Sequence, residues 1–463
     1  MVMAKMFTPS PRLETTFAGV KMRSPIGVGA VGRPMGNDIP PELHAEVLLK
    51  HATEGGAGYI YVPIVAYASK ESREKLAEAT KGVKPPVLSK YAPSERWLVA
   101  YGPHPPYGVE GIMSQNTHPC VHNSIDMDDE YREFALKTLD IIQKKKPEGV
   151  ILIANVRGYG PIPDTYVDGA KYWADQGVDL IEMIWNCPAS MAMCGAVEEY
   201  CTETFNAGWP SSTMGQIPRF VEEIQREVAK AVKIPTGAKL TPEIGFPAMV
   251  EMVQKIHDAG AKWITLAGGQ LTMPPPDIYN GGKPTYAFCN INAFSAAFGS
   301  WLRASSYKNV AAIGRFVPGM AIAGSGGIVT PQQCVEMMML GAGMVEITTA
   351  IMEQGRSILR RSNTFLDKFM VEQGYKSTAD IIGLAQKYID DLDKVDFQSG
   401  NIISETDEDK CTNCGICTDG FCVCRRMEGG KLVVDIDNCS GCGGCLASCH
   451  EAHAITLKQK VAR

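Results

Sequence analysis

Nine of the fifteen cysteines of this chain lie close to its C-terminus, between Cys411 and Cys449. The last four, Cys439, Cys442, Cys445 and Cys449, follow the spacing C-x2-C-x2-C-x3-C, with His450 where proline is usual. Thiolates at this spacing can each reach a different iron of one [4Fe–4S] cubane, and the fourth cysteine normally ligates a second cluster. A disulfide framework is typical of short secreted chains, so this crowding indicates metal ligands.

The upstream half of the cysteine segment is less regular. Cys411, Cys414 and Cys417 repeat the triplet, but the next cysteines, Cys422 and Cys424, follow five and seven positions later instead of four. We therefore expect one cluster on Cys411, Cys414, Cys417 and Cys449. The second would use Cys439, Cys442, Cys445 and either Cys422 or Cys424, with Cys422 slightly favoured. Zinc sites usually pair two C-x2-C units rather than triplets, so two [4Fe–4S] clusters in a ferredoxin-like module are predicted.

Two glycine-rich or hydroxyl-rich segments near residue 340 predict a phosphate site. They are Ala323-Gly-Ser-Gly-Gly-Ile328 and Glu346-Ile-Thr-Thr-Ala350, each at the end of a predicted strand. Glycine allows backbone N–H groups to approach an anion closely, and a following helix end adds positive partial charge. Gly27-Val-Gly-Ala-Val-Gly32 also matches G-x-G-x-x-G, but Arg33-Pro34 is a poor helix start, so we do not expect a dinucleotide site there.

The elements that must position these residues alternate along most of the chain. Eight apolar runs read as buried strands: Pro25–Ala30, Gly58–Pro63, Val150–Asn155, Val178–Trp185, Pro235–Leu240, Trp263–Ala267, Met320–Gly324 and Met344–Thr348. Helical patterns between them include Asp128–Lys145, Pro218–Lys233, Pro247–Ala259 and Gln332–Gly341. The pattern favours an α/β fold, a TIM (β/α)8 barrel, with a doubly wound sheet as the alternative. Long insertions at 64–148 and 268–319 would cover the barrel mouth.

Three parts are expected: a barrel over 1–387, a helix and acidic linker over 388–410, and the α+β ferredoxin-like domain over 411–463. The net charge of −6 and the absence of a basic tract argue against a nucleic-acid partner. We see no apolar run long enough to cross a membrane and no secretory signal at the N-terminus, so a cytoplasmic location is expected.

Several motifs resemble the dihydroorotate and dihydropyrimidine dehydrogenases, and most closely the FMN and iron–sulfur portion of the latter. Glu182-Met-Ile-Trp-Asn-Cys-Pro188 is similar to that family's N-x-S-C-P motif, and Gly215-Gln-Ile-Pro218 to its G-Q-x-P stretch. Ile234-Pro-Thr-Gly-Ala-Lys-Leu-Thr-Pro242, the Gly326-Gly-Ile328 turn and the cysteine module also match, in the right order. The resemblance covers most of the chain from about residue 15 onward.

The resemblance implies FMN at the barrel mouth, a cofactor that exchanges electrons singly with clusters and pairwise with substrate. Its expected contacts are Gly29, Ala30, Lys239, Gly268, Gly326, Gly327, Thr348 and Thr349. Lys239 would stabilise negative charge at the flavin N1/O2 edge. Cys187 falls on the family's catalytic cysteine, the proton donor for C=C reduction by hydride from flavin N5, with Cys194 and Cys201 as further candidates.

The sequence departs from the family where substrate is held. The motif's asparagine is Ile184 and its serine is Asn186, Gly268-Gly269 replaces an Asn-Thr pair, and Pro63 replaces a lysine. A site without those amides loses the hydrogen bonds that select a pyrimidine. We therefore expect a flat cyclic or aromatic substrate with fewer amide groups, held by Arg157, Trp185 and Asn186.

The alternatives are a dihydropyrimidine dehydrogenase subunit acting on uracil or thymine, and a non-catalytic electron-transfer or assembly subunit. No convincing NAD site is found in the sequence, which implies ferredoxin or a separate NAD(P)H-flavoprotein subunit as the electron partner. Since the relatives are commonly oligomeric, a homo-oligomer is also expected.

Overall fold

A computed structural model gives the fold of the chain. It describes residues 6–30, 39–63, 67–79, 96–98, 112–115, 129–158, 162–186, 191–192, 209–210, 215–266, 268–272, 276–284, 295–390, 392–394, 402–420, 422–450 and 452–459. The chain divides into two compact units, Met1–Ile389 and Asp390–Arg463, which are treated separately below.

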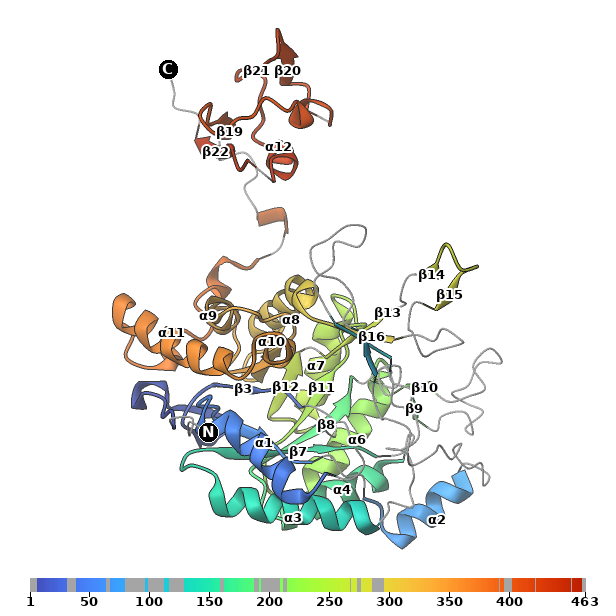
Figure 1. Ribbon diagram of the computed structural model, residues 1–463. Coiled ribbons are helices and arrows are strands. Elements are labelled where there is room, and N and C mark those ends of the chain that lie inside the picture. Colours follow the sequence, from blue (N-terminus) through green and yellow to red (C-terminus); the bar gives the residue numbers. More distant parts are fainter. Residues whose placement is uncertain are drawn as a thin grey trace. The chain divides into compact units, whose positions relative to one another are not determined.

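Eight parallel strands form the centre of the first unit (Figure 1). They are β3 (Ile26–Val28), β4 (Tyr59–Tyr61), β7 (Ile151–Val156), β8 (Leu180–Trp185), β11 (Thr236–Leu240), β12 (Trp263–Leu266), β17 (Ala321–Ser325) and β18 (Met344–Ile347). Their order is β3-β18-β17-β12-β11-β8-β7-β4, and a backbone hydrogen bond of 2.9 Å from Gly58 N to Ile26 O joins the two ends. The sheet is thus a closed TIM barrel, which confirms the predicted fold, and every predicted strand overlaps an observed one.

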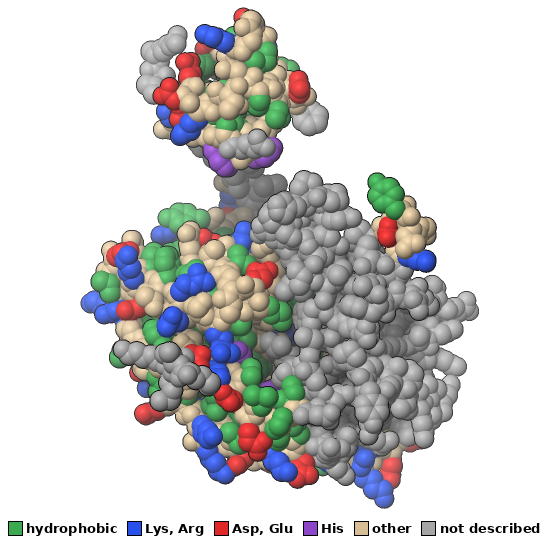
Figure 2. Space-filling view, in the orientation of Figure 1, with side chains coloured by type: hydrophobic (Ala, Val, Ile, Leu, Met, Phe, Trp, Pro, Cys, Tyr) green, Lys and Arg blue, Asp and Glu red, His purple; other side chains and the backbone are tan. Residues whose placement is uncertain are grey.

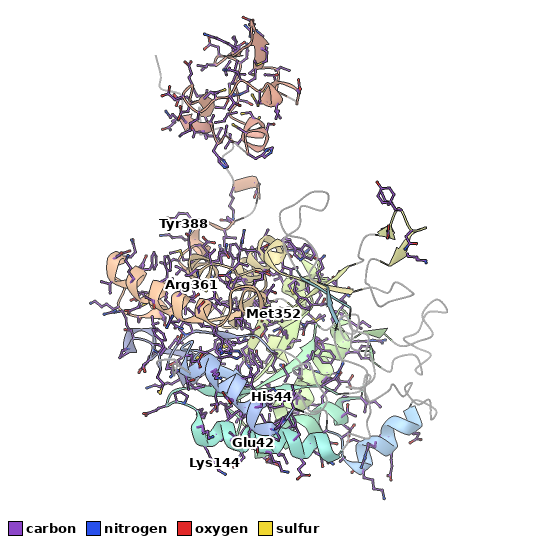
Figure 3. All side chains as sticks on the ribbon, viewed as in Figure 1. Glu42, His44, Lys144, Met352, Arg361 and Tyr388 are labelled. Carbon is purple, nitrogen blue, oxygen red and sulfur yellow. The ribbon has the colours of Figure 1, made fainter. Side chains whose placement is uncertain are left out.

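Helices surround the strands, as Figure 1 shows. They are α1 (Pro41–Thr53), α2 (Lys70–Ala79), α3 (Asp129–Lys145), α4 (Pro163–Asp175), α6 (Pro218–Ala231), α7 (Ala248–Asp258), α8 (Arg303–Phe316), α9 (Pro331–Met339), α10 (Thr349–Gln354) and α11 (Ser357–Gln373), with 3-10 turns η1 (Pro11–Leu13), η4 (Ser300–Leu302) and η5 (Thr378–Asp380). Helix α6 is representative, since Phe220, Val221, Ile224 and Val228 share one buried face. Exposed side chains such as Lys144 on α3 lie on the outer surface (Figure 3).

The charged side chains of the barrel unit are mixed in sign over the face seen in Figure 2. Many are paired along a helix, such as Lys50 with Glu46 at 2.5 Å on α1 and Lys144 with Asp140 at 2.6 Å on α3. Pairs of this kind contribute only about 0.2–0.5 kcal/mol each, so burial of the apolar helix faces accounts for most of the stability. Within the described part of the chain, no helix has the length and apolar character needed to span a bilayer.

A hairpin closes the amino end of the barrel. It comprises β1 (Thr15–Phe17) and β2 (Val20–Met22), and Phe17 packs edge-on against Trp263 with ring centroids 5.5 Å apart. Phe17 and Met22 share the interior apolar cluster with Leu180, Trp263 and Met344, each the first residue of its strand. Because the hairpin fills this end, the carboxyl ends of the strands remain for a site.

The two long insertions meet in one antiparallel sheet. Its order is β13 (Gln270–Thr272), β16 (Ser295–Phe298), β6 (Ile112–Gln115) and β5 (Arg96–Leu98), so it joins strands from both insertions. Two further ribbons pair β9 (Met191–Ala192) with β10 (Trp209–Pro210), and β14 (Pro276–Asp277) with β15 (Lys283–Pro284). Most of the remaining insertion sequence lies outside the described residues.

The prediction of a helix from residue 388 was wrong for the described part of 388–410. This stretch contains the 3-10 turns η6 (Gln386–Tyr388) and η7 (Leu392–Lys394) and then strand β19 (Ile402–Thr406). Strand β19 pairs antiparallel with β22 (Ile455–Gln459) over five residue pairs, so its backbone groups are satisfied in a sheet. The second unit also contains β20 (Arg425–Glu428) paired with β21 (Lys431–Val434), η8 (Ile416–Thr418) and α12 (Gly444–Ser448).

Closure of the barrel generates a first prediction, centred on Tyr59 of β4. Its hydroxyl donates to the carbonyl of Val345 at 2.7 Å, and its ring occupies the space that a side chain at Gly27 would need. Tyr59→Phe leaves that buried carbonyl without this partner, so we expect a loss of about 1–3 kcal/mol in the free energy of unfolding. Urea titration measures it, with Tyr279→Phe, at a 95% exposed position, as a control expected to unfold like wild type. Equal midpoints for both variants would contradict this role.

Candidate functional site

A pocket of about 570 Å³ opens at the carboxyl ends of the barrel strands. Its lining comes from β11, β17, β18 and the loops that follow β3, β8 and β12: Ala30, Asn186, Lys239, Gly268, Gly269, Phe298, Gly299, Leu302, Ser325, Gly326, Gly327, Ile328, Val329, Glu346, Thr348 and Thr349. TIM barrels carry their active sites at this end of the strands.

Glycines bring the backbone to the pocket wall. Gly326 and Gly327 after β17 have φ of +98° and +80°, a region that favours glycine, and a side chain at Gly327 would collide with the backbone of Arg303. A side chain at Gly29 would collide with Thr348 and Glu346. Backbone N–H groups and the hydroxyls of Thr348 and Thr349 suit a phosphate oxygen, so this part of the pocket fits a phosphate-bearing cofactor.

Lys239 and Glu346 form a buried ion pair in the pocket floor. Lys239 Nζ lies 2.7 Å from Glu346 Oε2, and the two side chains are 9% and 0% exposed. Burial opposes the positive charge, but the carboxylates of Glu346 and Glu182 outweigh it and raise the pKa of Lys239 above its ordinary value. The lysine is therefore a cation at neutral pH.

A second carboxyl group joins this pair through Tyr61. The Tyr61 hydroxyl lies 2.6 Å from Glu346 Oε1 and 3.0 Å from Glu182 Oε1. Glu182 also accepts from Thr265, and from Asn155 Nδ2 at 2.5 Å. Burial raises the pKa of Glu182 to about 7, partly countered by the charge of Lys239.

The structure gathers most of the residues predicted to bind the cofactor. Ala30, Lys239, Gly268, Gly326, Gly327, Thr348 and Thr349 all line the pocket, and Gly29 lies directly against Thr348. Of the residues predicted to bind substrate, Asn186 lines the pocket, with its side chain against Gly268.

The other predicted substrate residues are placed differently. Trp185 is fully buried and stacks on Tyr166 of α4 at 4.9 Å, in the layer between strands and helices, so the structure does not bring it to the pocket. Arg157 follows β7 and is only 6% exposed, with its Nη2 lacking a hydrogen-bond partner among the described residues. Cys187, Cys194 and Cys201 lie outside the described residues.

Sequence reasoning missed three residues of the pocket floor: Tyr61, Glu182 and Glu346. One signal was available, because Glu182 and Glu346 are single acidic residues inside otherwise apolar strands. A buried carboxylate is costly unless it is paired, so such a residue predicts a partner nearby.

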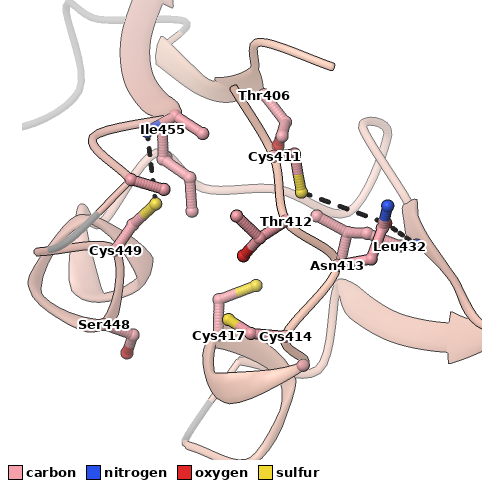
Figure 4. Close-up of a pocket in the computed structure, with 13 residues that line it drawn as sticks. Thr406, Cys411, Thr412, Asn413, Cys414, Cys417, Leu432, Ser448, Cys449 and Ile455 are labelled. Carbon is pink, nitrogen blue, oxygen red and sulfur yellow. Dashed lines mark hydrogen bonds between the residues drawn. The ribbon is translucent and has the colours of Figure 1, made fainter. Parts of the chain in front are cut away.

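In the second unit, four cysteines surround one pocket of about 370 Å³ (Figure 4). They are Cys411, Cys414, Cys417 and Cys449, the set predicted for the first cluster. Among the described residues no three Cys, His, Asp or Glu side chains converge on a single-ion site. A cubane distributes its four thiolates over four irons, so its ligands need only surround a cluster-sized space.

The two cysteine triplets have the same backbone. Asn413 and Gly441, which precede the second cysteine of each triplet, have φ of +52° and +66°. Gly415 and Gly443, which follow it, have φ of +80° and +79°, and each begins a short helix. The equivalent turns present both triplets in the same way.

Arg425 lies between the two sets of thiols. It is 3% exposed, and its Nη1 lies 3.9 Å from Cys417 Sγ and donates to Thr406 Oγ1 at 3.0 Å. Its Nη2 donates to Ser404 Oγ at 2.9 Å, and the Ser404 backbone N–H donates to Cys439 Sγ at 3.4 Å. A buried guanidinium here compensates negative charge on thiolates of both sets.

The pKa of Glu182 generates a prediction for stability against pH. Its carboxyl group binds a proton more readily in the folded chain, so the folded state loses stability, relative to a neutral residue, as pH rises from 4.5 through 7. Glu182→Gln should therefore gain stability over wild type in that window, at about 1.4 kcal/mol per unit of pKa shift, with no further gain above it. Thermal unfolding at pH 4.5, 6 and 8 measures this, with the exposed Glu148→Gln as a control. A difference independent of pH would contradict it.

Comparisons with known proteins agree with this geometry, although no family model matches the chain. The chain is 29% identical over 238 residues to the catalytic subunit of dihydroorotate dehydrogenase B (NAD(+)) of Methanothermobacter thermautotrophicus, covering 51% of this chain and 70% of that one. It is 28% identical over 282 residues to the NAD-dependent dihydropyrimidine dehydrogenase subunit PreA of Escherichia coli, covering 58% and 60%.

A solved structure supports the fold. The crystal structure of DHODH from Eimeria tenella in complex with ferulenol aligns with a TM-score of 0.55 at 15% identity, over 82% of this chain and 90% of that one. The sequence relatives are dihydroorotate and dihydropyrimidine dehydrogenases, oxidoreductases that act on CH–CH bonds, and the solved structure shares the barrel fold of this chain.

Proposed function

We propose that this chain is an FMN-dependent and iron–sulfur-dependent oxidoreductase that reduces, or forms, a C=C bond in a small cyclic or aromatic substrate. The observation that carries the proposal is the pocket in which Lys239 and the loops after β17 and β18 converge. The glycine and hydroxyl residues of the two loops predicted a phosphate site, and the family resemblance predicted FMN and the role of Lys239. The matched relatives are dehydrogenases, and the match spans 70% and 60% of the first two.

The pocket provides groups for both ends of FMN. Gly326, Gly327, Thr348 and Thr349 would hold the phosphate, and Lys239 would lie at the N1/O2 edge of the ring. The bound flavin would supply two-electron chemistry to substrate and one-electron exchange with clusters. Cys187 would give the proton to the carbon next to the one that receives hydride.

The pocket wall favours a flat substrate that has fewer amide groups than a pyrimidine. At the positions of the family's Asn-Thr pair, Gly269 lies against the ring of Phe298, and a side chain there would collide with it. An aromatic ring cannot replace amide donors and acceptors. Asn186 is the one amide among the residues lining the described pocket, and we propose that it and Arg157 orient the substrate.

Electrons would pass between FMN and an external partner through two [4Fe–4S] clusters in the second unit. The four thiols around one pocket and the equal backbone of the two triplets support this proposal. Both matched relatives are named as subunits of NAD-dependent enzymes, which favours an external donor here, either ferredoxin or a separate NAD(P)H-flavoprotein subunit.

Anaerobic purification with a substrate screen tests the function. We expect a flavin spectrum, about eight irons per chain, and reoxidation of the reduced flavin by cyclic enones, phenols or carboxylated rings rather than by uracil or thymine. Efficient turnover of uracil would instead support a dihydropyrimidine dehydrogenase subunit. Reoxidation by none of the compounds would favour an electron-transfer or assembly subunit.

Cys187→Ala tests the proton donor. With the best compound from the screen, we expect turnover to fall by about 10²–10⁴-fold, while dithionite still reduces the flavin. Cys334→Ala is the matched control, because burial raises the pKa of that thiol to about 12 and it should be inert. Equal turnover by Cys187→Ala and wild type would refute the role of Cys187.

The remaining cluster ligand is assigned by a matched pair of variants. Cys424 Sγ lies 3.0 Å from the carbonyl oxygen of Asn438, which suits a protonated thiol donor rather than a thiolate, so we propose Cys422 as the fourth ligand. Cys422→Ser should lower iron from about eight to about four per chain, whereas Cys424→Ser should retain about eight. The reverse pattern would identify Cys424 as the ligand.

A further inference from the structure

The positive charge of Lys239 is already compensated before any ligand enters the pocket. Its ammonium group lies 2.7 Å from the fully buried carboxylate of Glu346, and both residues line the same pocket. A lysine with no such partner would present a net positive charge to whatever binds above it. The Lys239–Glu346 pair presents a dipole with no net charge.

The second carboxyl group, that of Glu182, adds no net charge to the Lys239–Glu346 pair. A count of the available hydrogen atoms supports this. Tyr61 has one hydroxyl hydrogen, yet its oxygen lies within hydrogen-bond distance of both Glu346 Oε1 and Glu182 Oε1. Tyr61 can donate to one oxygen only, so the other contact needs a proton on a carboxyl group. The 2.6 Å contact to Glu346 is the shorter, and Glu346 also accepts from Lys239. Burial raises the pKa of Glu182 to about 7, so below that pH Glu182 is the carboxyl group that carries the proton.

Among the described residues of the neighbouring strands, no other charge faces the pair. The titratable groups facing Glu346 are Lys239 on β11, Glu182 on β8, and Tyr59 and Tyr61 on β4. Burial raises the pKa of both tyrosines well above the ordinary value, so they stay neutral. Strands β3 and β17, which flank β18, have the sequences IGV and AIAGS and contain no titratable side chain. The pocket floor is thus neutral overall.

We propose that Glu346 is a positioning residue that cancels the charge of Lys239, so that the bound flavin takes up two protons with its two electrons and has a low reduction potential. This inference rests on the proposed FMN site. Two electrons and one proton leave a reduced flavin with net negative charge, which an uncompensated lysine would stabilise. Two electrons and two protons leave it neutral, which suits a neutral floor. The electrons come from a one-electron iron–sulfur donor in two transfers, and the protons come from solvent.

Potentiometric titration of the anaerobic full-length protein at the flavin absorbance band tests the proposal. Each proton taken up changes the reduction equilibrium tenfold per pH unit, or about 30 mV for a two-electron couple, so wild type should show twice this slope below pH 7. In Glu346→Gln the amide keeps the contacts to Lys239 and Tyr61 while the negative charge is lost. For Glu346→Gln we expect the equilibrium between oxidised and reduced flavin to shift at least tenfold toward the reduced form. Its reduction potential should change with pH by the amount that corresponds to one proton.

Two further variants complete the experiment. Glu182→Gln replaces a protonated carboxyl by a neutral amide. Below pH 7, the equilibrium constant for reducing the flavin in this variant should therefore stay within a few-fold of the wild-type value. The double variant Lys239→Gln, Glu346→Gln removes both charges and should also keep the wild-type slope, which gives the comparison if the single variant loses flavin. An unchanged potential and slope in Glu346→Gln, or a raised potential in the double variant, would overturn the inference. A wild-type protein that binds no FMN would instead refute the proposed function.

Discussion

The buried pair of Lys239 and Glu346 is the constraint around which the pocket is built. Two charges removed from water destabilise a fold unless they are paired and their remaining hydrogen-bonding groups are satisfied. Here β4, β8 and β12 provide partners through Tyr61, Glu182 and Thr265. Asn155 of β7 also donates to Glu182, so six strands of the barrel are linked through side chains in its interior, and their relative positions determine where the lysine is presented.

The same arrangement explains why glycines line the mouth. The carboxyl ends of β3 and β17 lie close to the Lys239–Glu346 pair, and the space above the pair must stay open as one continuous pocket. Gly29 lies against Glu346 and Thr348, and Gly327 against the backbone of Arg303, so a larger residue at either position would fill the pocket or displace its wall. The hairpin at the opposite end has the complementary role, because Phe17 and Met22 exclude water beneath the charged layer.

The strands and most of the pocket were predictable because their signals are local. Buried runs such as Ile151–Val156 are apolar throughout, and glycine pairs mark close approach. The prediction that Trp185 contacts substrate was wrong because a residue next to a motif in the sequence need not point in the same direction as the motif's functional side chains. Side chains alternate across β8, so Glu182 faces the barrel interior while Met183 and Trp185 face the helices. Strand β19 was missed because its partner, β22, lies some fifty residues further along the chain. Pairing at that range leaves no trace in local periodicity.

Each of the two units contains acidic groups that are shielded from bulk water, and the two units compensate the negative charge differently. In the barrel, a carboxylate is matched by a lysine on a facing strand. In the second unit, thiolate ligands would have Arg425 between them, reaching Cys417 directly and Cys439 through Ser404. The consequences for redox chemistry are opposite. If both groups bind as proposed, the compensated lysine would withhold positive charge from the flavin and lower its reduction potential, whereas the buried arginine beside thiolates would favour the more negative, reduced state of a cluster.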